Sequence, residues 1–351
     1  MKRILIGLIA LVVITAGGWF GFNAYVQHRA TAEVDAAFEQ LRSGGNKASH
    51  GKVAFDLSTR TLTIADITVE RAAQPPATVQ IAGIKAVGVS QVDDNKVSAD
   101  SIEVSDTQFT FESAAGATNL KAAYKAPQII VRDFSGPVRT QGAPASEALA
   151  DLYRFAIDQF VGVTASSVVA PTIAISINPG SSGPGSGEIA YSGLAIEKIR
   201  NGRFDAAKMD RATFAINVQQ PGRPDKLTGE LVNMIVNDFD ANAVAAVLDP
   251  QKISDETFHR VYRQISTGTY VVTSTQGVGR LRAIKYGEGE LALEGLDAPS
   301  PQGQVKMERF AVKSFSTGNL MRWAAQFANL TQTPTPDQVL GLFRVLEGAE
   351  I

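Results

Sequence analysis

The side chains that most often perform chemistry in proteins are sparse in this sequence. The chain contains no cysteine, which excludes disulfides, thiolate metal sites and cysteine nucleophiles. Its three histidines, His28, His50 and His259, show none of the spacings that are typical of metal ligands. We therefore expect no zinc site.

Two further patterns could carry chemistry, but each has a simpler structural interpretation. The run GSSGPGSGE lacks a following Lys-Ser/Thr pair and a helix pattern, so it predicts neither a phosphate-binding loop nor a dinucleotide-binding turn. Asp238 and Asp240 flank Phe239, and we interpret them as a turn and a helix N-cap rather than as a catalytic pair. The sequence predicts no catalytic residue and no cofactor, and we expect that the protein is not an enzyme. An enzyme built from scattered Ser, Lys and Asp residues is the minor alternative.

The N-terminal segment MKRILIGLIALVVITAGGWFGF must position everything that follows it. Residues 4–22 carry no charge, which matches the length that a helix needs to cross ~30 Å of hydrocarbon at ~1.5 Å per residue. Lys2 and Arg3 precede this run, and aromatic residues cluster at its far end, up to Tyr25. The pattern predicts a single-pass inner-membrane anchor, with the N-terminus in the cytosol and the bulk of the chain in the periplasm. The alternative is a cleaved signal peptide, with Ala16-Gly17-Gly18 at the cleavage site.

The composition of the chain limits its possible partners and its fold class. Its 351 residues are 44% hydrophobic, and the formal net charge is −2, so no basic field is available to attract nucleic acid. Arg203, Lys208 and Arg211 form a small basic cluster, which we interpret as a solvated strand face. The 31 glycines and the recurrent alternation of apolar residues favour a β-rich fold with many turns.

Alternating residues indicate a series of antiparallel strands with one apolar face. The segment from Val53 to Ile64 predicts a β-hairpin around Ser58-Thr59-Arg60, and a meander continues through 79–89 and 97–111. Asn201-Gly202 is a strong signal for a second hairpin turn. The candidate lipid-facing residues on these strands are Phe55, Leu57, Leu62, Ile64, Val87, Phe109 and Phe111.

Helical spacing predicts a stalk helix at 29–42, ending at Gly44-Gly45, which we expect to dock on the following sheet. Further helices are predicted at 146–160, 242–248, 255–265, 320–330 and 337–346. The predicted organisation is an anchor at 1–25, the stalk helix at 26–45, a first β-rich lobe at 46–178 and a second at 179–351, with C-terminal helices. The glycine-rich run near residue 180 is either a long hairpin loop or the seam between the lobes. The predicted fold class is α+β, mostly β, with a transmembrane helix followed by curved antiparallel sheets and short covering helices.

A short internal repeat occurs where predicted strands end. IIVRDFSG, MIVNDFDA and FAVKSFST each run from apolar residues through a polar pair to a phenylalanine. We interpret Phe134, Phe239 and Phe315 as plugs at strand-to-helix corners, either by duplication or by independent origin of similar corners.

The layout resembles that of the AsmA-like bacterial envelope proteins. The resemblance lies in the N-terminal anchor, the stalk helix, the hairpin HGKVAFDLSTRTLTIADITVE and the later segment YSGLAIEKIRNGRFDAAKMDRATFAI. It implies a curved antiparallel sheet with an apolar inner face and a role in lipid movement or outer-membrane maintenance. It implies no catalytic residues.

The leading hypothesis is therefore an anchored periplasmic protein that binds phospholipid or another envelope lipid through an apolar sheet face left partly uncovered by helices. The rival hypothesis is a non-enzymatic assembly or scaffold factor whose sheet edge binds an envelope protein by strand addition.

Overall fold

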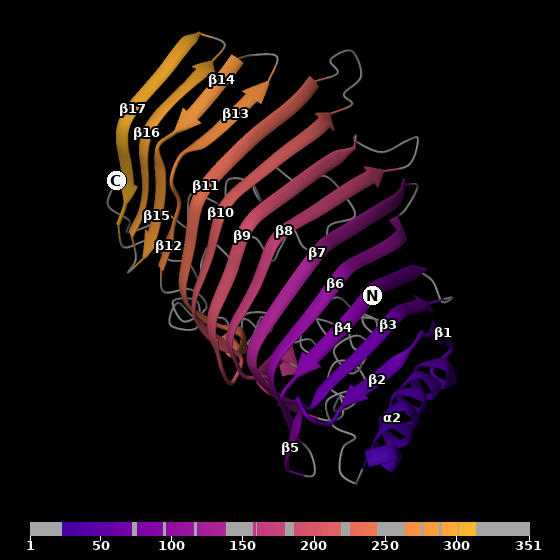
Figure 1. Ribbon diagram of the computed structural model, residues 1–351. Helices are drawn as coiled ribbons and strands as arrows, with labels where there is room; N and C mark the ends of the chain where they lie inside the picture. Colours follow the sequence, from indigo (N-terminus) through magenta and orange to yellow (C-terminus); the bar gives the residue numbers. More distant parts are fainter. Residues whose placement is uncertain are drawn as a thin grey trace.

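The computed structural model describes residues 23–71, 76–93, 96–115, 118–137, 157–158, 160–179, 186–218, 225–243, 264–274, 277–287, 290–300 and 302–313. These residues form helix α2, short helical segments and a single antiparallel sheet of 17 strands (Figure 1). The first strands are β1 (Asn46–Ser49), β2 (Val53–Asp56), β3 (Thr61–Arg71), β4 (Ala77–Val87), β5 (Ser90–Asp93), β6 (Lys96–Ala115), β7 (Thr118–Pro137), β8 (Ala165–Pro179) and β9 (Gly187–Ile199). The remaining strands are β10 (Arg203–Val218), β11 (Asp225–Asp240), β12 (Gln264–Ser266), β13 (Tyr270–Ser274), β14 (Gly277–Leu281), β15 (Ala283–Gly287), β16 (Glu290–Ser300) and β17 (Gly303–Val312).

The strands follow one another across the sheet as a meander. β1 and β2 both pair with β3, which pairs with β4, and the ladder continues through β6 to β11. Beyond β11, each of the next two positions across the sheet is occupied by two short strands. β12 and β13 share the first position, and β15 and β14 share the second. β16 and β17 complete the far side of the sheet. The prediction of a mostly β protein with antiparallel pairing is confirmed.

Two local features agree with the residues that produce them. Asn201 and Gly202, with φ of 50° and 74°, join β9 to β10, because a tight hairpin turn needs positive φ at both central residues. β8 and β9, on either side of the glycine-rich run, pair directly from Ala165↔Ile199 to Ile177↔Gly187. The run therefore connects two neighbouring strands of one sheet.

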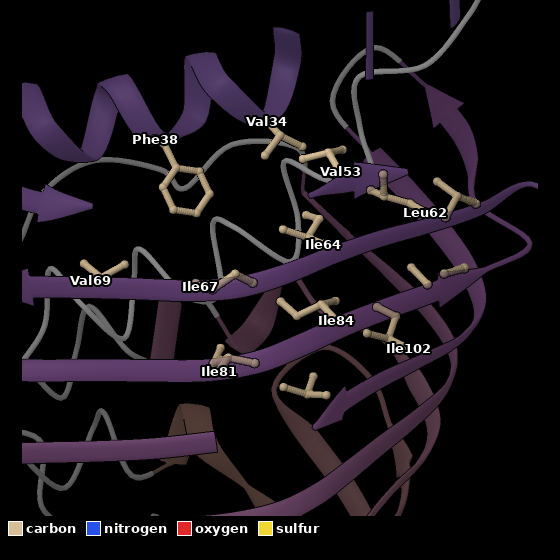
Figure 2. Packing of buried hydrophobic residues seen from close by; sticks show 14 of the residues in the cluster. Val34, Phe38, Val53, Leu62, Ile64, Ile67, Val69, Ile81, Ile84 and Ile102 are labelled. Atoms are coloured by element: carbon tan, nitrogen blue, oxygen red, sulfur yellow. The ribbon is translucent and has the colours of Figure 1, made fainter. Parts of the chain in front are cut away.

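Helix α2 (Asn23–Ser43) packs its apolar stripe on the first strands of the sheet. Val34 and Phe38 are 1% and 0% exposed, and Figure 2 shows Phe38 directed toward Ile67 and Val69. The helix ends where Gly45 adopts a φ of 83°, a conformation that glycine adopts without strain. α2 contains the predicted stalk helix and docks on the sheet.

Several predicted helices lie outside the described residues: the segment 4–22, most of 146–160 and of 242–248, and both C-terminal helices. The described residues of 157–160 are helical, as are residues 241–243. The helix predicted to extend to residue 265 is wrong at its end, because Gln264–Ser266 forms strand β12. Three residues at that end pair with β11 on one side and β15 on the other, so ladder hydrogen bonds replace the helical ones. Among the described residues, no helix has the length and apolar character needed to span a bilayer.

Candidate functional site

A row of residues in the left-handed backbone conformation crosses the sheet perpendicular to its strands. Asp66 in β3 and Asp106 in β6 have φ of 51° and 49°, and both lie opposite the same position of β4. Gly193, Asn233 and Gly295 continue this row in β9, β11 and β16, with φ of 68°, 52° and 62°. A left-handed residue interrupts extended backbone and bends the strand. We call this line the first bend row.

Two prolines occupy the same row in central strands. Pro127 lies in β7 and Pro171 in β8, where the pairing of these strands stops after Lys125 and resumes at Ile130. Proline cannot donate to a ladder, so within sheets it is found at edges and bulges. The interruption at the bend row allows both prolines to lie inside the sheet.

A second bend row runs parallel to the first. It contains Arg60, Gly88, Asp133, Lys198 and Asp238, with φ of 50°, 70°, 49°, 54° and 53°. The two rows are five to six residues apart along the strands, which corresponds to about 17–20 Å. Figure 1 shows the long central strands bending along their length.

At each bend row the alternation of buried residues breaks. In β6 the buried positions are Val97, Ala99, Ile102, Val104 and Thr107, so their spacing is two, three, two and three. A spacing of three leaves two consecutive residues on the opposite face, where regular alternation would leave one. That face becomes longer than the buried face, and the strand bends toward the buried side.

The bends do not disturb the register of the sheet. Between β6 and β7 the same register holds from Lys96↔Pro137 through Val104↔Ile129 to Ala115↔Thr118. A bulge in one strand alone would shift the register, because two residues would then oppose one. Here neighbouring strands carry their extra residue in the same row, so the sheet bends into a trough along shared lines, the first from β3 to β16 and the second from Arg60 to β11.

The concave face of the trough is apolar across the sheet, and we call it the apolar face. Its residues lie opposite one another in rows, one of which crosses every strand position from β3 to β17, while another runs from β3 to β14. One row consists of Leu62, Ala86, Ile102, Val131, Val168, Ile196, Ala207, Val236, Ile265, Tyr286, Leu291 and Val312. Another consists of Val69, Val79, Phe109, Tyr124, Ile175, Ile189, Phe214, Gly229, Val272 and Gly279.

The apolar face is most completely buried near α2, and its exposure toward β17 is uneven. Val69 and Val79, near α2, are 1% and 3% exposed, whereas in β17 Val305 is 45% exposed and Val312 is 3% exposed. The largest cluster of buried residues joins α2 to β2, β3, β4 and β6. α2 therefore closes the trough at the beginning of the sheet.

One glycine on this face makes room for an aromatic ring. Gly229 lies opposite Phe214, and a Cβ atom at Gly229 would come within 2.2 Å of the Phe214 ring. The centroid of the Phe214 ring also lies 6.3 Å from that of Tyr270 in β13, which pairs with β11. The missing side chain leaves room for the Phe214 ring beside Gly229.

The opposite face, which we call the polar face, carries cross-strand ion pairs. Lys208 is 2.9 Å from Glu197 and Arg211 is 3.2 Å from Glu230. Arg203 is 2.6 Å from the buried Asp240. The predicted basic cluster is thus neutralised residue by residue.

Two carboxylates on the polar face are held in their charged form. The hydrogen bond from Lys285 lowers the pKa of Glu294 below its ordinary value. The hydrogen bond from Lys198 lowers the pKa of Asp205 in the same way, with Arg200 adding a further favourable charge. Such exposed pairs add little stability each, but together they make the polar face hydrophilic.

The sequence-predicted lipid-facing residues lie at the α2 end of the sheet. Leu62 and Ile64 are buried beneath α2, at 2% and 0% exposed, and Phe55, Phe109 and Phe111 are partly buried against the same cluster. Leu57 lies in the turn after β2. Val87 is opposite Ser101 and belongs to the polar face, next to the second bend row.

The predicted corner phenylalanines have different environments. Phe134 is buried, at 6% exposed, and joins the main core cluster. Phe239 is partly buried and stacks on Phe204, with ring centroids 4.7 Å apart. Phe315 lies outside the described residues. In both described cases the preceding aspartate, Asp133 or Asp238, is a left-handed residue of the second bend row.

Sequence reasoning missed most of the apolar face from β8 to β17. The signal was present as apolar spacings of two, three and two, as in Leu291, Leu293, Leu296 and Ala298. A search for strict alternation fails on such strands, because each bend row shifts the phase by one residue.

Asp240 and His50 have structural partners. The Oδ1 atom of Asp240 accepts hydrogen bonds from the backbone N–H groups of Asn242 and Ala243, at 3.0 and 3.4 Å, so the predicted helix N-cap is confirmed. His50 donates to Asp35 through Nε2 at 2.9 Å. Within the described ranges, no group of three His, Asp or Glu side chains is placed to hold a metal ion.

Comparison with known proteins gives no relative: no family model, curated protein or solved structure matches this chain.

Proposed function

We propose that this protein is a membrane-anchored, non-enzymatic envelope protein of the periplasm that binds the acyl chains of lipids in the trough. The observation that carries the proposal is the apolar face, one of whose rows crosses the sheet from β3 to β17 on the concave side of the bends. Its span is roughly 50 Å, at about 4.8 Å for each strand position.

The two faces of the sheet differ in the way that a lipid-binding trough requires. Burial of each methylene group of an acyl chain is worth about 0.8 kcal/mol, and the floor offers aliphatic and aromatic side chains without a charge in either row. The polar face instead presents ion pairs such as Lys208–Glu197 to water. The proposed anchor at residues 4–22 would hold the trough beside a source of lipid, and the resemblance to AsmA-like proteins points in the same direction.

Photocrosslinking in the full-length, membrane-inserted chain tests this proposal. A benzophenone amino acid at Phe214 would lie on the apolar face, and the same group at Thr213 would lie on the polar face of the same strand. We expect phospholipid adducts, detected by mass spectrometry, from position 214 and at least about tenfold fewer from position 213. Equal yields, or none from position 214, would overturn the proposal.

A second experiment alters the floor itself. Phe109→Asp places a charge on the apolar face, and Gln108→Asp places one on the neighbouring exposed position. Burying an unpaired carboxylate beside acyl chains is unfavourable, so we expect lipid crosslinking at position 214 to fall for the first variant only. Circular dichroism would establish that both variants keep their β structure.

A further inference from the structure

The two edges of the sheet are built differently. At the beginning, β1 and β2 have four residues each, and α2 packs beside them (Figure 1). At the other edge, β17 has ten residues and pairs with β16; in the described part of the chain it has no second neighbour. An uncovered edge strand presents backbone donors and acceptors that another strand can pair with.

In β17 the order of apolar-face and polar-face residues is symmetric about the point between Glu308 and Arg309. Val305, Met307, Phe310 and Val312 lie opposite Ala298, Leu296, Leu293 and Leu291 of β16 and share the apolar face. Lys306, Glu308, Arg309 and Ala311 share the polar face. Read in either direction from the centre, the order of faces is the same, and the two central residues have opposite charges.

We propose that two copies of this chain join through their β17 strands, in antiparallel pairing about a two-fold axis between Glu308 and Arg309. Val305 then lies opposite Val312 of the partner, and Met307 opposite Phe310 of the partner. Glu308 lies opposite Arg309 of the partner, and the symmetry repeats this ion pair on the other side of the axis.

The charges of the side chains and the faces on which they lie both favour this register. Moving the second copy by one residue places Glu308 opposite Glu308, and it sets Met307 of the apolar face against Arg309 of the polar face. Glu308 is 3.1 Å from Arg282, and Arg309 is 2.5 Å from Glu290; their side chains are 86% and 57% exposed. The four groups would form a charge network across the joined edges.

The junction makes one continuous apolar face from two copies. Because Met307 and Phe310 flank the first bend row, that row would also cross the junction without a break. The proposal rests on the charges of the β17 side chains and on the face that each occupies, and it holds whether or not the trough binds lipid. Its failure and that of lipid binding are therefore distinguishable.

A charge exchange tests the pairing on the full-length chain in detergent, by analytical ultracentrifugation. Glu308→Arg places arginine opposite Arg309, and Arg309→Glu places glutamate opposite Glu308, each twice in a symmetric dimer. We expect each variant alone to dimerise roughly tenfold more weakly than the native chain. An equimolar mixture of the two variants should restore dimers, since every contact then joins opposite charges. Glu197→Arg, which breaks an exposed ion pair inside the sheet, is the matched control and should leave the dimer unchanged.

Cysteine crosslinking gives an independent test, because the native chain contains no cysteine. Directly opposite residues of antiparallel strands have Cα atoms about 4.5–5.5 Å apart, within the range that a disulfide bridges. A mixture of Met307→Cys and Phe310→Cys chains should form a disulfide-linked dimer on mild oxidation, and a mixture of Met307→Cys and Lys306→Cys chains should form at least about fivefold less. A native chain that stays monomeric at about 100 µM, or a variant mixture that fails to recover, would overturn the proposal.

Discussion

At the scale of single residues, the bend rows depend on side chains that tolerate the left-handed conformation. Short polar side chains that bond locally adopt it more readily than other L-residues. Six of the eight non-glycine residues with positive φ are aspartate or asparagine: Asp66, Asp106, Asp133, Asn201, Asn233 and Asp238. Asn201 belongs to the hairpin turn, and of the ten left-handed residues in the two bend rows five are aspartate or asparagine and three are glycine.

Replacing Asp106 with valine should destabilise the fold through backbone strain. Asp106 has a φ of 49° and lies on the polar face, so the loss of packing is small. A β-branched residue in this conformation costs about 1–3 kcal/mol. Chemical denaturation should show that loss in the free energy of unfolding.

The control is Ser105→Val, at the neighbouring polar-face position of the same bend row, whose φ is not positive. This variant should change the free energy of unfolding by less than about 0.5 kcal/mol. Equal losses for the two variants would show that bulk or polarity, rather than φ, is what position 106 requires.

At the scale of elements, α2 is the piece that converts one end of an open sheet into a packed core. Its Phe38 ring is fully buried and meets the His50 ring edge-on, with centroids 4.5 Å apart. His50 in turn bonds to Asp35 of the helix. The packing of Phe38 and the His50–Asp35 hydrogen bond thus both hold the helix on the sheet.

Phe38→Ala should remove most of this attachment. Truncation of a fully buried phenylalanine costs about 3–5 kcal/mol, so the midpoint of denaturation should fall markedly. Hydrogen exchange should become faster in β2 and β3, which α2 covers.

The matched control is Glu39→Ala, one residue further along the helix. Its side chain is 70% exposed and pairs with Arg42, and its loss should cost no more than about 0.5 kcal/mol. If Phe38→Ala were as mild as Glu39→Ala, α2 would not be part of the cooperative core.

At the scale of the whole molecule, the trough is formed by one bent sheet. The register stays constant through both bends, so each new strand adds the same profile to the end of the trough. The proposed lipid binding and the proposed pairing of two copies both follow from this repetition.

Attachment to the membrane is predicted from the N-terminal sequence. If residues 4–22 remain as an anchor, the protein should stay in the membrane fraction after an alkaline wash, and protease added to spheroplasts should digest the chain beyond Tyr25. The physical reason is the uncharged run behind Lys2 and Arg3. A soluble chain that begins near Trp19 would show instead that the segment is a cleaved signal.

The sequence alone determined the class of the fold and several of its local elements. Period-two alternation identified the first hairpin, Asn201-Gly202 identified the turn between β9 and β10, and helical spacing identified α2. Each of these signals acts over a few residues, through backbone preference or through which side chains share a face.

The tertiary structure alone decided where the strands bend and how far the apolar face extends. A spacing of three in a single strand, as between Ile64 and Ile67, reads as an irregularity, and only the pairing of neighbouring strands aligns these irregularities into a row. It also decided that Leu62 and Ile64 lie under α2, while Val305 at the far edge is exposed. The reason is that a bend shared by many strands, and the cover supplied by a helix, depend on contacts between distant residues, which no local preference specifies.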